Sequence, residues 1–222
     1  MAEKCFRIRD LRTITSLGGQ VPRTNGVYKW WCKRDLLERF LKGIALTLED
    51  CINDIELRND FVLTTTDNGN IVEETINDEY YCVYVGESDD LHQRILGSNG
   101  HINGHHTFKT ISCLFLSTLR QTISSVLFLD QSKENETNEI LNQMIIEIFY
   151  DFNEDVHRFQ NNQINSYFRC LNNDDIDSAS SNIYSTRRHY EIHRMHLVSF
   201  EITRLRKAGL LIGIWNSEFI IE

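Results

Sequence analysis

The sequence predicts an α/β (α+β) protein in which a small, mostly antiparallel sheet is flanked by helices. Two runs rich in aromatic and β-branched residues, GVYKWW at 26–31 and YYCVYV at 80–85, are typical of buried strands. A third run, MIIEIFY at 144–150, has the same character. The segments between them place apolar residues at helical spacing, so helices are expected to cover the sheet.

Composition sets the class of protein. The 222 residues are 41% hydrophobic and 25% charged, which is typical of a soluble domain with a sizeable core. The N-terminal stretch has no apolar signal region, and no run approaches the roughly 18 apolar residues of a membrane span. We therefore expect a cytoplasmic protein without membrane contact. The six cysteines are scattered without a CxxC pair, which predicts reduced, buried thiols.

Charge is unevenly distributed along the chain. The net charge of −9 disfavours nucleic-acid binding, because such surfaces are usually basic. Residues 46–79 carry ten carboxylates against a single arginine, whereas residues 186–207 hold six arginines and lysines. An acidic total can therefore coexist with a basic face, and Arg187, Arg188 and Arg194 are predicted DNA contacts.

The first half of the chain contains an insertion between the first two core strands. VPRTNG at 21–26 marks a turn before the first strand. KRDLLERFLKGIAL at 33–46 has the period of a helix that ends near Gly43. Two β-prone runs around Asp-Asn-Gly-Asn at 61–75 then predict a hairpin. Together these elements form an acidic insertion over about 33–79, which is tolerable because loop entropy grows slowly with length.

The second half alternates helices and loops. A short helix is predicted at 89–96, with Ser88 or Asp89 as its N-cap. A glycine- and histidine-rich loop follows at 97–107, and then a buried helix in STLRQTISSVLFL. Another helix ends near Arg169, and a long one is closed by Gly209. We expect one domain over 1–175 and a helical extension over 176–222.

Three motifs give the chain a recognisable pattern. Gly26-Val27-Tyr28 and Tyr84-Val85-Gly86 lie on predicted strands, and Arg94 follows on the next helix. This arrangement resembles the GIY-YIG nuclease superfamily, whose two strands lie side by side with an arginine about ten residues after the second tyrosine. HINGHHT and the STLRQT helix resemble stand-alone bacterial members. The resemblance covers roughly residues 20–175, and the long separation of the two tyrosines resembles that in restriction-type members.

The resemblance implies a set of catalytic residues. Tyr28 is the expected base for the attacking water, or its hydrogen-bonded assistant, and it needs a nearby cation because a phenol ordinarily has a pKa of about 10. Arg94 is expected to hold the phosphate through its planar donor fork. Tyr84 is expected to orient the nucleophile or phosphate, His101 to share the proton traffic, and Asn172 to anchor a helix end.

The family's metal ligand is absent at its expected place. Members carry a glutamate about twelve residues before the asparagine, where this chain has Gln160. The implied cofactor is Mg²⁺ or another divalent cation such as Mn²⁺, and a neutral amide is a poorer ligand for it than a carboxylate. We therefore expect catalysis to be impaired, either by engineering or by natural loss.

Several functions are compatible with these residues. The first is a metal-dependent, restriction-like endonuclease acting on double-stranded DNA, for which a symmetric homodimer is suitable. The second is a catalytically inert DNA-binding or regulatory protein on the same scaffold, and the third is an acidic protein-interaction module. Arg120 in the STLRQT helix either binds DNA phosphate or satisfies backbone groups.

Plainer interpretations remain for individual residues. Tyr28 and Tyr84 also suit a strand packed into a core, and Arg94 suits a solvated helix face. His189, His193 and His196 share one helical face, where they suit either zinc or a basic surface.

Overall fold

The computed structural model describes residues 1–43, 46–104, 117–127 and 134–152, together with Val156, Phe159 and Leu171. In chain order its elements are β1 (Ala2–Arg7), α1 (Ile8–Thr13), α2 (Thr15–Gly18), β2 (Gly26–Cys32), α3 (Arg34–Gly43), α4 (Leu48–Cys51), β3 (Leu57–Asp67), β4 (Asn70–Ser88), α5 (Leu91–Leu96), α6 (Thr118–Val126), α7 (Glu134–Asn142) and β5 (Ile145–Tyr150). The predicted linker and the extension over 176–222 lie outside the described residues.

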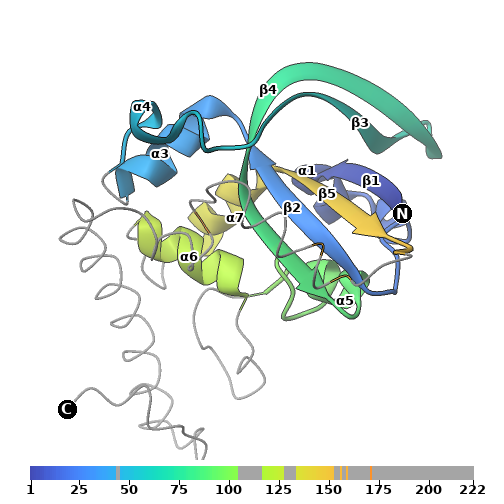
Figure 1. Cartoon of the computed structure of the whole chain (residues 1–222). Coiled ribbons are helices and arrows are strands. Elements are labelled where there is room, and N and C mark those ends of the chain that lie inside the picture. Colours follow the sequence, from blue (N-terminus) through green and yellow to red (C-terminus); the bar gives the residue numbers. More distant parts are fainter. Residues whose placement is uncertain are drawn as a thin grey trace, which may run out of the picture.

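The strands form one sheet that closes on itself (Figure 1). Their hydrogen-bonded order is β1-β3-β4-β2-β5, and β5 pairs again with β1. Every pairing is antiparallel except the short contact between β1 and β3. The predicted fold class, a mostly antiparallel sheet flanked by helices, is confirmed. The closure of the sheet, and the strand β1 that completes it, were not expected.

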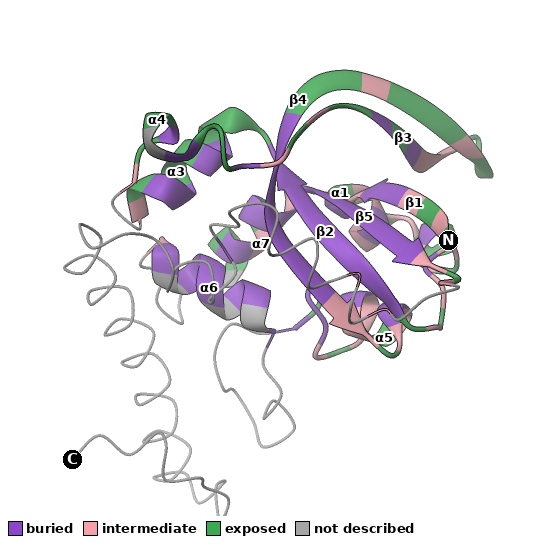
Figure 2. Cartoon of the chain, in the orientation of Figure 1, coloured by how far each residue is buried: buried purple, intermediate pink, exposed green. Residues whose placement is uncertain are grey.

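The three predicted core strands are direct neighbours. β2 lies between β4 and β5, and all seven of its residues are buried (Figure 2). Tyr28 is paired with Gly86 of β4 on one side and with Ile148 of β5 on the other. The strand that carries Gly26-Val27-Tyr28 is therefore central, which fixes the direction of its side chains.

The predicted hairpin at 61–75 is present, and its second strand is longer than expected. The turn falls at Asn68 and Gly69, both with positive φ, as an Asn-Gly hairpin turn requires. β4 then continues without a break from Asn70 to Ser88, so the hairpin strand and YYCVYV are one strand. The hairpin of the predicted insertion is thus an extension of the core sheet that arches over it (Figure 1).

The sheet separates two hydrophobic clusters. On the helix side, Tyr28 and Trp30 pack with buried residues of α3, α6 and α7 such as Phe40 and Leu119. On the hairpin side, Trp31 packs edge-on against Phe61 of β3, with ring centroids 5.4 Å apart. Because each buried large apolar side chain contributes about 1.5–3 kcal/mol, these two clusters hold the sheet in place.

Two further expectations can be compared with the structure. Cys5, Cys32, Cys51 and Cys82 are buried, as predicted, whereas Cys113 and Cys170 lie outside the described residues. Within the described part of the chain, every helix is too short or too polar to cross a membrane.

Candidate active site

Tyr28 is packed directly against the glycine that ends Tyr84-Val85-Gly86. Gly86 is the cross-strand partner of Tyr28, and a β-carbon at Gly86 would come 2.4 Å from the Tyr28 phenol oxygen. A side chain at position 86 would therefore displace the phenol. The glycine is required because the ring of Tyr28 occupies the space of a side chain.

The regular pairing of β2 with β4 places Tyr84 on the same face as Tyr28. Tyr28 is paired with Gly86, and Trp30 with Tyr84, two residues further along each strand, so these side chains share a face; the β-bulge at Val83 begins only after Tyr84. The rings of Tyr28 and Tyr84 are 6.3 Å apart, with planes inclined by 23°. The two tyrosines thus lie side by side, as the resemblance implied.

Helix α5 brings Arg94 to the two tyrosines. Its N-cap is Asp90, whose side chain accepts a hydrogen bond from the Gln93 backbone, and not Ser88 or Asp89 as predicted. The helix packs so closely on the strand that a β-carbon at Gly26 would lie 2.6 Å from Leu91. Nε of Arg94 donates a hydrogen bond to the Tyr28 phenol oxygen at 3.2 Å.

The glycine-rich loop returns His101 to the same phenol. The His101 backbone N–H donates to the Arg94 carbonyl at 2.9 Å, and Gly100 has no room for a β-carbon beside that carbonyl. Nε2 of His101 lies 2.8 Å from the Tyr28 oxygen, and Nδ1 lies 2.6 Å from the hydroxyl of Ser117. We call Tyr28, Tyr84, Arg94 and His101 the tyrosine cluster.

Burial dominates the electrostatics of the tyrosine cluster. Tyr28 and His101 are fully buried, and Arg94 is half-buried. Burial and the neighbouring Tyr84 raise the pKa of Tyr28, and Arg94 opposes this shift. Burial and the charges of Arg94 and Arg120 hold the pKa of His101 well below its ordinary range, so its imidazole is neutral. Because burial opposes its ionisation, the phenol of Tyr28 is protonated in the resting protein.

Arg120 lies inside the protein, which corrects its prediction as a DNA contact. It is fully buried, and Nη1 donates to the backbone carbonyls of His101 and Ile102 at 3.2 and 3.1 Å. Nη2 donates to the side-chain oxygen of Asn138 at 2.8 Å. The alternative that Arg120 satisfies backbone groups therefore describes its position.

Two residues in this network were missed by the sequence reasoning. Arg12 of α1 donates to the Ile102 carbonyl at 3.1 Å and to the side-chain oxygen of Asn138 at 2.6 Å. The Asn138 oxygen therefore accepts hydrogen bonds from both Arg12 and Arg120. Ser117 caps α6 by accepting a hydrogen bond from the Arg120 backbone. A serine immediately before a helix is a visible N-cap signal, whereas nothing in the local sequence links Arg12 to His101.

The remaining predicted site residues lie outside the described part of the chain. They are Gln160, Asn172, Arg187, Arg188 and Arg194. Leu171, which precedes Asn172, is described, and its backbone N–H donates to the Val83 carbonyl at 2.9 Å. The chain thus returns to β4 beside Tyr84 immediately before Asn172.

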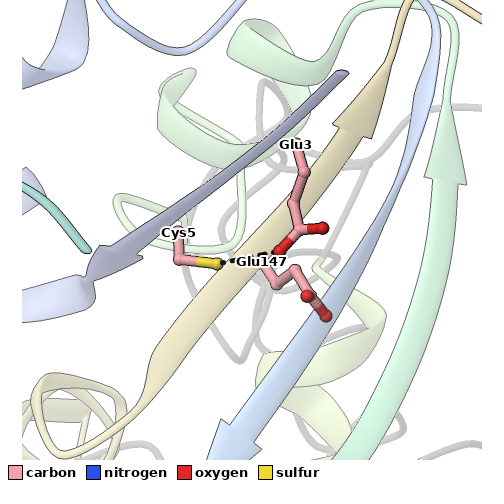
Figure 3. Close-up of side chains that lie close together, drawn as sticks. All are labelled: Glu3, Cys5 and Glu147. Atoms are coloured by element: carbon pink, nitrogen blue, oxygen red, sulfur yellow. Dashed lines mark hydrogen bonds between the residues drawn. The ribbon is translucent and has the colours of Figure 1, made fainter. Parts of the chain in front are cut away.

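A second cluster of titratable groups lies on the hairpin side of the sheet. Glu3, Cys5 and Glu147 have side-chain donor atoms within 4.8 Å of one another (Figure 3). Arg58 pairs with both carboxylates, and the Trp31 indole donates to Glu147 at 3.0 Å. Burial raises the pKa of Glu147 to about 8, although Lys29 and Arg58 oppose it. Arg58 therefore occupies the position between the two carboxylates that a metal ion would take.

One comparison with known proteins gives a match. A family model described as the GIY-YIG catalytic domain matches residues 26–188, a range that includes the whole tyrosine cluster. No curated protein and no solved structure matches the chain.

Proposed function

Because the chain belongs to the GIY-YIG catalytic-domain family, which is a nuclease family, we propose that it is a metal-dependent endonuclease scaffold for double-stranded DNA, impaired by Gln160. The observation that supports this most is the convergence of Tyr28, Arg94 and His101 at one phenol oxygen. These residues come from three separate segments, and ordinary packing does not require them to share one atom.

Phosphodiester hydrolysis places three demands on a site. The attacking water must lose a proton, the developing charge on the phosphate must be stabilised, and the leaving oxygen must be neutralised. The tyrosine cluster contains a phenol and an imidazole for proton transfer and a guanidinium for the phosphate. It thus contains side chains suited to the first two demands.

Arg94 is the member of the cluster that meets the phosphate in this proposal. It is half-buried, whereas Tyr28 and His101 are fully enclosed. A guanidinium presents several N–H groups in one plane, and this geometry matches phosphate oxygens. Binding of a phosphate at Arg94 would bring the scissile bond next to the Tyr28 oxygen.

Tyr28 acts on the attacking water in this proposal. Its burial opposes ionisation, and hydrogen bonds to its oxygen favour the phenolate. Arg94 donates one such bond, and His101 forms a second contact. Tyr84, which is 8% exposed, lies beside Tyr28 and would orient the water or the phosphate. Water has to reach the enclosed phenol oxygen, so substrate binding must open the site.

The residues present do not fit the metal that the family generally uses. Divalent cations such as Mg²⁺ and Mn²⁺ prefer carboxylate oxygens, and position 160 is a glutamine. Among the described residues, the one group of three metal-ligand side chains lies on the hairpin side, with Arg58 between its carboxylates. We therefore assign no catalytic step to a metal in the chain as it stands.

A catalytically inert DNA-binding protein is the second candidate, because Gln160 favours it. Both candidates predict DNA binding that weakens steeply with salt, since phosphate contacts release counterions. An acidic protein-interaction module would show no such binding.

Cleavage of supercoiled plasmid with Mg²⁺ or Mn²⁺ distinguishes the first two candidates. We expect the Gln160→Glu variant to cut at least about 10³-fold faster than the unchanged chain, because the missing ligand is worth several kcal/mol. Equal rates would show that position 160 is not the metal site. An inactive Gln160→Glu variant that still binds DNA would favour the inert protein.

A further inference from the structure

Ser117 has two hydrogen-bond partners in a fully buried position. Its hydroxyl oxygen accepts from the Arg120 backbone N–H at 3.3 Å, and it lies 2.6 Å from Nδ1 of His101. A hydroxyl has one hydrogen to donate and two lone pairs to accept with. The two contacts together restrict which atom donates in the Ser117–His101 bond.

Counting hydrogens assigns the proton on His101. If Ser117 donates to Nδ1 of His101, that bond uses its single hydrogen. One of its oxygen lone pairs then accepts from the Arg120 backbone N–H. The neutral imidazole then carries its hydrogen on Nε2 and donates it to the Tyr28 oxygen. The phenol hydrogen of Tyr28 is in turn donated to the hydroxyl of Tyr84, with which Tyr28 shares a side-chain hydrogen bond. In the opposite tautomer Nδ1 would donate to Ser117, and the buried serine hydrogen would have no acceptor among its contacts in the described residues. An unsatisfied buried polar hydrogen costs about 1–3 kcal/mol.

We propose that Ser117 is a positioning residue that fixes His101 as a hydrogen-bond donor to Tyr28. The Tyr28 oxygen then receives two hydrogen bonds, one from Nε2 of His101 and one from Nε of Arg94. Both bonds stabilise the phenolate that a base requires, and they oppose the effect of burial. This inference rests on the proposed function for its catalytic meaning, and its structural part stands alone.

The surroundings of His101 fix its charge and its backbone position, so that its tautomer remains to be assigned. The titratable and charged groups that face it are Tyr28 of β2, Tyr84 of β4, Arg94 of α5 and Arg120 of α6. Burial and the two guanidinium groups hold the pKa of His101 far below its ordinary value, so the doubly protonated ring is excluded near neutral pH. Arg120 also donates a hydrogen bond to the His101 carbonyl, which fixes the backbone that carries the imidazole ring.

The tautomer can be measured without any cleavage assay. We would record ¹⁵N–¹H correlation spectra of the full chain labelled at histidine nitrogens, and assign His101 by the signals lost in His101→Asn. The expected result is an unprotonated Nδ1 and a protonated Nε2 between about pH 6.5 and 8. A protonated Nδ1 would overturn the proposal. Because no substrate is needed, this result is independent of whether the chain is a nuclease.

Kinetics test whether the tautomer matters for the reaction. In the Gln160→Glu background, Ser117→Ala should lower kcat about tenfold with little change in KM, the cost of one weakened hydrogen bond. The rising limb of the pH–rate profile should also move to higher pH, because the phenol of Tyr28 becomes harder to ionise. Ser124→Ala removes another buried hydroxyl from the same helix and serves as the matched control.

The pH profile separates positioning from a purely structural role. Loss of the α6 cap alone would reduce activity equally at all pH values, in step with a lower melting temperature. An unshifted profile in Ser117→Ala would therefore overturn the catalytic part of the proposal. If Ser117→Ala does not fold, the tautomer of the unchanged chain still decides the structural part.

Discussion

The phenol of Tyr28 occupies the space in which Gly86 would otherwise carry a side chain. A β-carbon at position 86 would lie 2.4 Å from the phenol oxygen and 2.5 Å from the ring carbon that bears it. The glycine of Tyr84-Val85-Gly86 is thus explained by the tyrosine of Gly26-Val27-Tyr28. This contact links the two tripeptides physically, beyond their order along the chain.

Gly86→Ala tests this link. The added methyl group must push the Tyr28 ring away, because the ring cannot shorten, and overpacking of this kind typically costs about 1–3 kcal/mol. We expect a moderate loss of stability and a large loss of cleavage in the Gln160→Glu background. Melting curves and plasmid cleavage measure the two effects.

Gly18→Ala is the matched control for that variant. A β-carbon at Gly18 would meet only an ordinary contact, 3.5 Å from Leu96. It should leave both stability and cleavage close to those of the parent. If Gly86→Ala behaved in the same way, the phenol would not occupy the position described.

Arg120→Met tests the interior role of Arg120. The substitution removes donors from the His101 and Ile102 carbonyls and from Asn138, and leaves these buried acceptors less well satisfied. We expect a loss of about 3 kcal/mol or more in chemical denaturation. The salt dependence of DNA binding should be unchanged, because Arg120 makes no phosphate contact.

The pair Arg187→Ala and Arg188→Ala provides the contrast to Arg120. Sequence reasoning places these residues on a DNA-facing surface, so the double variant should reduce the slope of log K against log salt by about one for each lost phosphate contact. Its stability should change little. An unchanged slope would remove these two arginines from the DNA interface.

Glu147→Gln tests the buried charge on the hairpin side of the sheet. The folded protein holds the pKa of Glu147 near 8, above its ordinary 4.5, mainly because the carboxyl is buried. Between these pH values the folded state binds more protons at Glu147 than the unfolded state does. Stability due to this group is therefore fully present below about pH 4.5 and is lost as pH rises toward 8.

The comparison with Glu147→Gln isolates that group from other titrations. Chemical denaturation from pH 5 to 8 should show the parent losing stability relative to the variant as pH rises, if burial outweighs the pairing with Lys29 and Arg58. A relative gain for the parent with rising pH would mean that the ion pairs dominate. Gln retains an acceptor for the Trp31 indole, so that hydrogen bond is not removed by the test.

The sequence predicted the core strands because almost all of their side chains are apolar or aromatic. β2 is buried on both faces, and its aromatic run is therefore a strong signal. β1 was missed because AEKCFR lacks the strict alternation of a half-buried strand: the charged Glu3 and Lys4 are consecutive, and so are the buried Cys5 and Phe6. The unbroken length of β4 was also hidden, since polar residues at 77–79 resemble a break between two strands.

The site was partly predictable. Tyr28, Tyr84 and Arg94 could be anticipated from the resemblance to the GIY-YIG family, whose two motifs lie on neighbouring strands with the arginine on the following helix. The interior position of Arg120 could not, because its acceptors are backbone carbonyls of a distant loop and an amide of α7. Sequence shows a side chain that needs partners, and only the fold shows where those partners lie.

The most direct measurement compares plasmid cleavage by the Gln160→Glu variant with that of Gln160→Glu combined with Arg94→Ala. Our account predicts that the first cuts DNA when a divalent cation is added and that the second, although folded, does not. Equal cutting by both proteins would contradict the assignment of Arg94 to the phosphate. Absence of cutting by both, with correct folding and DNA present in excess, would contradict the nuclease assignment itself.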